Sequence, residues 1–198
     1  MTHYNTIEKP SQAEFKDRGS RFIAYAFPIQ STDDFKKRLK ELKDEHTKAA
    51  HHCFAYRIGI DGNSFRSGDD GEPAGSAGKP ILGQIDSKGL TDLAVVVVRY
   101  FGGTLLGVPG LINAYKTSAS LALQLVPIMK KPVLVNYELQ YDYTQMNDVM
   151  IFIKRYAAVV LQNETQLFCR LVVGIPKAEE AVFLDRLNDL PGVGITKI

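Results

Sequence analysis

Three acidic residues in one glycine-rich stretch are the first groups in this sequence that suit chemistry. Asp69, Asp70 and Glu72 lie within "SGDDGEPAGSAGKPILGQI", residues 67–85. Carboxylates at this spacing can hold a divalent cation. The same acids alternate with glycines and prolines that form turns, which favours a rigid loop with no ligand. The candidate residues of this supporting loop are His52, Asp69, Asp70, Gly71, Glu72 and Pro73.

A second reactive group precedes the acids, in the run His51, His52 and Cys53. These side chains suit either metal ligation or a cysteine nucleophile paired with a histidine. Consecutive residues of a strand point to opposite faces, so at most one of the two histidines can join Cys53 in a simple cluster. We therefore expect no stoichiometric metal and no cofactor, and an enzyme built on this cysteine is the less favoured hypothesis.

The third candidate is a turn that follows the apolar strand of residues 93–101. Its glycines would let backbone N–H groups approach an anion at the positive end of the next helix. Arg99 offers a fork for phosphate and Tyr100 a ring for a base, whereas tight packing alone is the alternative interpretation. Neither a Walker loop nor a GxGxxG fingerprint is present. The predicted anion or RNA surface consists of Arg99, Tyr100, Gly102, Gly103, Gly107, Gly110 and Tyr115.

Arg99 has two alternative environments. It ends a strand otherwise rich in valine, where a charge is costly to bury unless it is paired. Its guanidinium therefore either emerges at the sheet edge, as a recognition residue, or pairs with an acid such as Asp70 or Glu72. In the second case Arg99 braces the acidic loop, and both stretches are structural.

The elements that position these groups form a mixed α/β unit. The run "LAVVVVRYF" is too continuously apolar for a strand with one exposed side, so we expect it in the middle of a sheet. The first helix has an N-cap candidate in Ser31 or Thr32, and the last one starts just after Pro109. The predicted elements are strands 21–29, 52–60 and 93–101 and helices 31–49 and 111–126.

A domain boundary is predicted at "PIMKKP", residues 127–132, which gives domains 1–129 and 130–198. The second part reads β-α-β-β-α-β, the ferredoxin-like order. Thr144 is the expected N-cap of the first helix of this part. Asn163 and Glu164 are expected to form a tight turn between two strands, and Cys169 is expected to be a small buried residue. The predicted elements are strands 133–141, 158–164, 165–176 and 192–198 and helices 144–157 and 177–190.

Composition restricts the class of protein. The chain of 198 residues is 45% hydrophobic and 23% charged, with a net charge of +2, as in soluble globular proteins. No apolar run is long enough to span a membrane, and the start is unlike a signal peptide. We expect a cytoplasmic protein with reduced thiols, no membrane partner and no DNA specificity.

Three ordered blocks carry a family resemblance: "HHCFAYRIG", "SGDDGEPAGSAGKPIL" and "VVVVRYFGGTLLGVPGLINAYKTSA". They resemble the signature of the YigZ/IMPACT family, which includes an Arg-(Tyr/Phe)-(Tyr/Phe)-Gly-Gly run followed by Leu-Gly and Gly-Leu. The two-domain layout extends the resemblance over essentially the whole chain, as in the bacterial YigZ branch. The chain departs from many relatives at Asn113, where they carry arginine.

The resemblance implies a fold and a function. It implies a first domain with the β-α fold of a small-subunit ribosomal protein, elongation factor G domain IV and galactokinase-type kinases. It also implies a ferredoxin-like second domain similar to the last domain of elongation factor G. Eukaryotic IMPACT members act in translational control by competing for the activator of an amino-acid-starvation kinase.

Two functions follow as expectations. The first is a translation-linked regulatory or binding protein that recognises RNA, the ribosome or a translation-factor partner. The alternative is an enzyme of the hydrolase or phosphotransfer type, acting on a small phosphorylated or peptide substrate. The relationship to small-molecule kinases favours the enzyme, and the lack of a nucleotide-binding loop argues against its kinase version.

Overall fold

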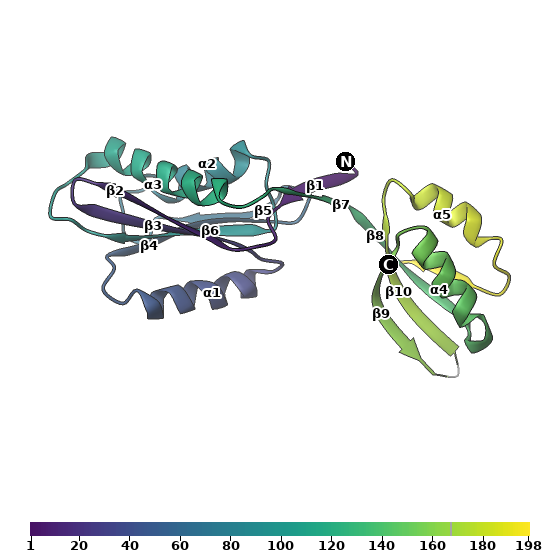
Figure 1. The fold of residues 1–198 in the computed structure, drawn as a ribbon. Helices are drawn as coiled ribbons and strands as arrows, with labels where there is room; N and C mark the ends of the chain where they lie inside the picture. Colours follow the sequence, from purple (N-terminus) through teal and green to yellow (C-terminus); the bar gives the residue numbers. More distant parts are fainter. Residues whose placement is uncertain (167) are drawn as a thin grey trace. The chain divides into compact units, whose positions relative to one another are not determined.

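The structure, a computed structural model, describes residues 1–166 and 168–198 of a mixed α/β protein. It divides into two compact units (Figure 1). The larger unit is Tyr4–Lys131, and the smaller one joins Met1–His3 to Pro132–Ile198. Along the chain, the division falls inside the proline-bracketed segment 127–132. Over the described ranges, no helix combines the length and apolarity that a membrane crossing requires.

The larger unit contains a five-stranded sheet with the order β2-β3-β6-β4-β5. Each neighbouring pair is antiparallel. The apolar strand β6 lies at the centre, and its residues are buried up to Arg99, so the prediction of a central strand is confirmed. Strands β2 and β5 were not predicted. The bounds are β2 Ser11–Asp17, β3 Ser20–Pro28, β4 His51–Ile58, β5 Ser64–Gly68 and β6 Leu93–Tyr100.

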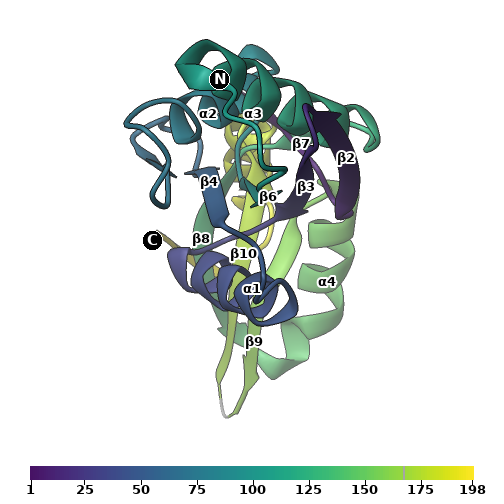
Figure 2. The ribbon, with the colours of Figure 1, turned by 90° about the vertical axis from the view of Figure 1, so that its left-hand side faces the viewer.

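Side-chain alternation along β6 separates two cores, one on each face of this sheet. Val95 and Val97 belong to the core under α2 (Gly78–Ser87) and α3 (Gly107–Gln124). Val96 and Val98 belong to the core under α1 (Thr32–Glu45). Helices α2 and α3 therefore cover one face, and α1 covers the other (Figure 1, Figure 2).

The helices of the larger unit differ in how their ends are defined. Ser31 caps α1 as predicted, in a capping box with Asp34. Helix α2 was not predicted, because its residues fall in the stretch expected to be a loop. Helix α3 begins at Gly107 rather than after Pro109. Proline is tolerated there because the first N–H groups of a helix have no intrahelical acceptor.

Two short strands, β1 (His3–Thr6) and β7 (Met129–Pro132), pair with each other in a separate two-stranded sheet. Neither strand was predicted. The periodicity of so short a segment carries little information, because four residues hold at most two alternations.

The smaller unit has the predicted order β-α-β-β-α-β. Its four strands lie in the order β11-β8-β10-β9, with antiparallel neighbours. Val149 and Ile153 of the first helix and Phe183 of the second pack in one core with strand residues. The bounds are β8 Leu134–Asp142, η1 Tyr143–Gln145, α4 Met146–Arg155, β9 Val159–Thr165, β10 Phe168–Pro176, α5 Glu180–Leu187 and β11 Gly194–Lys197.

Two local predictions for this unit are wrong. Asn163 and Glu164 do not form a turn, because they lie inside β9 and pair with β10. The connection instead follows Thr165, and Leu167 lies outside the described residues. Thr144 is not a helix cap. The carboxylate of Asp142 caps this turn, since it accepts from the Thr144 backbone N–H at 2.9 Å and hydroxyl at 2.8 Å.

Candidate binding pocket

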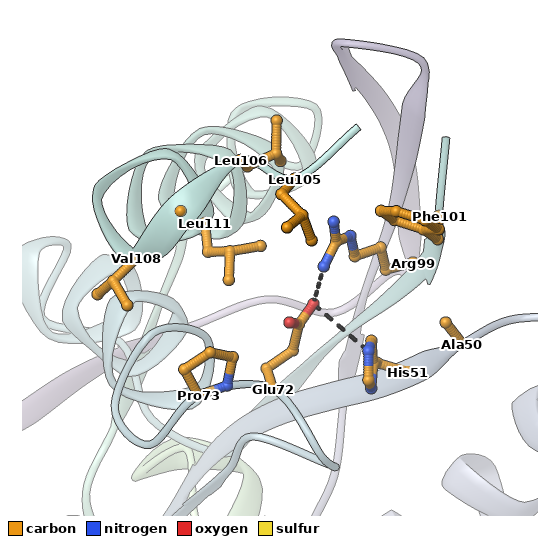
Figure 3. Close-up of a pocket in the computed structure, with 11 residues that line it drawn as sticks. Ala50, His51, Glu72, Pro73, Arg99, Phe101, Leu105, Leu106, Val108 and Leu111 are labelled. Carbon is orange, nitrogen blue, oxygen red and sulfur yellow. Dashed lines mark hydrogen bonds and ion pairs between the residues drawn. The ribbon is translucent and has the colours of Figure 1, made fainter. Parts of the chain in front are cut away.

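A pocket of about 490 Å³ opens in the larger unit, beside the end of β6 and the start of α3 (Figure 3). This volume lies in the range of roughly 300–1,000 Å³ that is common for ligand sites. Most of the lining is apolar, and three charged or titratable side chains stand among it. The lining residues are Ala50, His51, Glu72, Pro73, Arg99, Phe101, Leu105, Leu106, Gly107, Val108 and Leu111.

A buried ion pair between Arg99 and Glu72 forms the polar part of the pocket. Arg99 Nη1 donates to Glu72 Oε1 at 2.6 Å, and the two side chains are 6% and 4% exposed. Tyr115 donates its hydroxyl to the same oxygen at 2.7 Å. The guanidinium also lies 5.6 Å from the ring centroid of Phe101. Of the two predicted environments, Arg99 therefore has the paired one, in which it braces the acidic loop.

His51 faces this ion pair from the neighbouring strand. It lies opposite Arg99 in the antiparallel register of β4 and β6. Its Nδ1 is 2.8 Å from the carbonyl oxygen of Asp70, an atom that only accepts, so Nδ1 carries a proton. The Nε2 atom then faces Glu72 Oε1 at 3.8 Å (Figure 3). From the sequence, His51 was considered as a metal ligand or as the partner of a Cys53 nucleophile, and its position facing Glu72 was not predicted.

The acidic loop is held by the carboxylate of Asp69. This group accepts backbone N–H bonds from Gly75 at 2.8 Å, Ala77 at 3.0 Å and Gly78 at 2.7 Å. Burial raises the pKa of Asp69, but these three bonds outweigh it, so the pKa lies below its ordinary value. Because Gly78 is the first residue of α2, Asp69 also caps that helix from a distance. This capping explains how a helix starts inside the glycine-rich stretch.

Asp70 ties the same loop to β4. Its Oδ2 accepts from the His52 backbone N–H at 2.7 Å. Asp70 has a φ of 42° and Gly71 a φ of 91°, so the chain turns there through two left-handed conformations. The prediction of a conformationally specified loop thus has a physical basis in Asp69, Asp70 and Glu72, each of which is anchored.

The thiol of Cys53 is in an unreactive state. Cys53 Sγ lies 3.0 Å from the Asp69 carbonyl oxygen and 3.3 Å from Tyr115 Oη. Burial raises the pKa of Cys53 to about 12, so the thiolate that attacks substrates is not formed near neutral pH. Burial also raises the pKa of Tyr115. Throughout the part of the chain that the structure describes, no three His, Cys, Asp or Glu side chains are placed to hold a metal.

Tyr100 and His52 lie on the opposite face of the sheet. Tyr100 follows Arg99 on the strand, so its side chain points the other way, where its Oη lies 2.8 Å from His46 Nδ1. His52 is buried, and burial lowers its pKa. These two residues do not join Arg99 in one recognition surface.

The glycines of the turn have different structural roles. Gly102 packs against the turn between β2 and β3, since a Cβ atom there would lie 1.9 Å from the Gly19 carbonyl carbon. Gly107 has a φ of 70° and lines the pocket. Gly103 and Gly110 are not among the lining residues. Close packing, which was the alternative to an anion site, thus accounts for Gly102.

The exposed apolar side chains of the turn were missed by the sequence analysis. Leu105 is 82% exposed, Phe101 51% and Val108 47%. We call these three residues the apolar rim. The signal was present in "FGGTLLGVPG", where bulky apolar residues alternate with turn-forming glycines, but the glycines alone were considered.

The sequence has clear relatives. Residues 18–123 match the Impact N-terminal domain. The IMPACT family member YigZ of Escherichia coli is 36% identical over 172 residues, which are 86% of this chain and 84% of YigZ. Protein IMPACT of Rattus norvegicus is 38% identical over 100 residues, 48% of this chain and 31% of that protein. A crystal structure described as that of a hypothetical protein is 32% identical, with a TM-score of 0.80, and covers 100% of this chain and 98% of its own. The chain therefore belongs to the YigZ/IMPACT family.

Proposed function

We propose that this protein is a translation-linked regulatory protein that acts in the cytoplasm by binding a partner through the pocket. Membership of the YigZ/IMPACT family supports this function, because the family resemblance implies translational control for eukaryotic members. The strand order of the smaller unit supports a ferredoxin-like domain, similar to the last domain of elongation factor G. A first domain like elongation factor G domain IV is part of the same proposal.

One observation supports binding rather than catalysis. The reactive side chains are buried, and the apolar side chains around the pocket are exposed. Arg99 and Glu72 neutralise each other inside the protein, and Cys53 stays protonated. Leu105, by contrast, extends into solvent at the pocket mouth. The hydrolase or phosphotransfer alternative loses its candidate nucleophile in this arrangement.

The same observation ranks the proposed partners, which are RNA, the ribosome and a translation-associated protein. Nucleic acids are held mainly by cations that reach their phosphates. Arg99, the cation expected to do so, is 5% exposed and paired. Exposed aromatic and aliphatic side chains around a pocket instead match the centre of a protein interface. The pocket thus favours a protein surface, on the ribosome or on a translation factor.

Affinity capture from a cell lysate, with and without nuclease, tests this function. Wild-type protein should retain ribosomal proteins or translation factors, identified by mass spectrometry, and the retention should survive nuclease. Leu105→Asp should lose them, because a charge replaces the most exposed apolar group of the rim. Leu125→Asp is the matched control, since Leu125 is 65% exposed and does not line the pocket. Capture of no translation component, or nuclease-sensitive capture, would count against the proposal.

A further inference from the structure

We propose that the pocket takes one aromatic side chain that carries a neutral hydrogen-bond donor, a tyrosine or tryptophan of the protein partner. This inference rests on the proposed function and specifies its chemistry. It depends on three features of the pocket: two acceptors on its floor, a balanced charge, and apolar walls of suitable size.

The acceptors are Glu72 and His51. Arg99 and Tyr115 both donate to Glu72 Oε1. The contacts found for the Glu72 carboxylate all reach Oε1, and Figure 3 shows the other oxygen, Oε2, pointing away from Arg99 toward the side of Leu111 and Pro73. Because His51 Nδ1 carries a proton, its Nε2 is an acceptor in the neutral ring. The almost entirely buried Glu72 side chain thus presents to the pocket an oxygen that is open to a further donor.

The charge balance selects a neutral donor. Arg99 and Glu72 form a pair whose net charge is zero, 2.6 Å apart. A cationic ligand at Glu72 would lie close to the Arg99 guanidinium, and like charges at such separations repel strongly away from bulk water. An anionic ligand would face the carboxylate and the lone pair of His51. A hydroxyl or an indole N–H donates its one proton to either acceptor without these penalties.

The walls select an aromatic body for this donor. Phe101, Leu105, Val108 and Leu111 line the pocket, whose volume is about 490 Å³. Tyrosine and tryptophan combine a large apolar ring with one polar tip, so a single side chain satisfies both the walls and the floor. These residues are also enriched among the anchors of protein interfaces, where surrounding contacts exclude water. The apolar rim is placed to provide those contacts.

Nuclear magnetic resonance titration of the full ¹⁵N-labelled chain tests the inference with three probes. They are the N-acetyl amides of L-tyrosine, L-tryptophan and L-phenylalanine. We expect the tyrosine and tryptophan probes to shift backbone signals of the pocket residues at millimolar concentration. The phenylalanine probe lacks the donor, and a hydrogen bond to a charged group changes affinity by about tenfold or more. We therefore expect it to bind at least about tenfold more weakly than the tyrosine probe.

Leu105→Asp should weaken the binding of the tyrosine and tryptophan probes, and Leu125→Asp should leave it unchanged. Equal affinity for the tyrosine and phenylalanine probes would overturn the inference. It would also be overturned if no pocket signal moved, or if Leu105→Asp had no effect.

These outcomes separate the inference from the proposed function. If lysate capture depends on Leu105 but the tyrosine preference is absent, the function stands and the aromatic anchor is wrong. If the probes bind as expected but no translation component is captured, the anchor stands and the function is wrong.

Discussion

Two buried polar networks lie on opposite faces of the same sheet, and they differ in what covers them. The pocket network joins Glu72 to Arg99 and Tyr115. The α1 network runs from Tyr25 Oη to His46 Nε2, at 2.7 Å, and from His46 Nδ1 to Tyr100 Oη, at 2.8 Å. The pocket network anchors Arg99 of β6, and the α1 network anchors the next residue, Tyr100.

The two networks differ in what packs over them and in whether they contain charged side chains. The α1 network joins side chains that pack in and around the core under α1, and its hydrogen bonds link rings that carry no fixed charge. The pocket network contains a fixed ion pair and opens into a pocket with an apolar rim. A buried ion pair contributes little net stability compared with apolar packing. The comparison teaches that the charged network is the one placed beside the proposed binding pocket.

The largest expected loss of stability comes from breaking the ion pair between Arg99 and Glu72. Arg99→Ala leaves the Glu72 carboxylate buried without its cation, which should lower the free energy of unfolding by on the order of 3–5 kcal/mol. Urea denaturation of the full chain measures this loss. Arg21→Ala removes a partly exposed pair with Glu14 and should lower the free energy of unfolding far less. Equal losses for the two variants would show that Arg99 is not a structural brace.

A smaller effect is expected at the loop that supports the pocket. Asp69→Asn keeps the shape but removes the charge that caps α2, so it should cost about 1–2 kcal/mol at neutral pH. The pKa of Asp69 in the folded protein lies below its ordinary value of 3.8. Its stabilising contribution is therefore present above that value and is lost as the pH falls through the folded pKa.

The difference in unfolding free energy between wild type and Asp69→Asn should shrink on acidification below about pH 4. Denaturant titrations from pH 7 to pH 3 check this, and a difference that grows toward low pH would contradict the assigned hydrogen bonds.

The smallest effect is expected on the α1 network. Tyr100→Phe removes one hydroxyl and leaves His46 Nδ1 without it, at a cost of about 0.5–1.5 kcal/mol. Because Tyr100 lies on the face away from the pocket, capture of the partner should be unchanged. Tyr143→Phe, at an exposed site, should alter stability by less than about 0.5 kcal/mol. Loss of capture in Tyr100→Phe would place function on both faces of the sheet.

The sequence predicts the framework of the fold well where the signal is local. The continuous apolar run of β6, the Ser31 cap and the element order of the smaller unit all depend on neighbouring residues. The start of α2 depends instead on Asp69, nine residues before Gly78, and no local pattern encodes such a contact. The supposed turn at Asn163 and Glu164 failed because register with β10 outweighs turn propensity.

The candidate site was predictable in part. The costly burial of a charge limited Arg99 to two environments, and one of them, pairing with Glu72, is found. Strand alternation alone separates Arg99 from Tyr100, yet the two were grouped because they are adjacent in sequence. The exposure of Leu105 depends on how the turn packs beside β6 and α3. The residues of the turn alone do not determine this tertiary arrangement.

The most direct test of the central claim follows the side-chain methyl groups of the pocket while the captured partner is added. In a methyl-labelled full chain, the signals of Leu105, Val108 and Leu111 should shift or broaden on binding. Those of Leu125, which lies outside the pocket, should persist. This result is predicted if the apolar rim is the contact surface. Binding of the partner with the Leu105 and Val108 signals unperturbed would contradict the account.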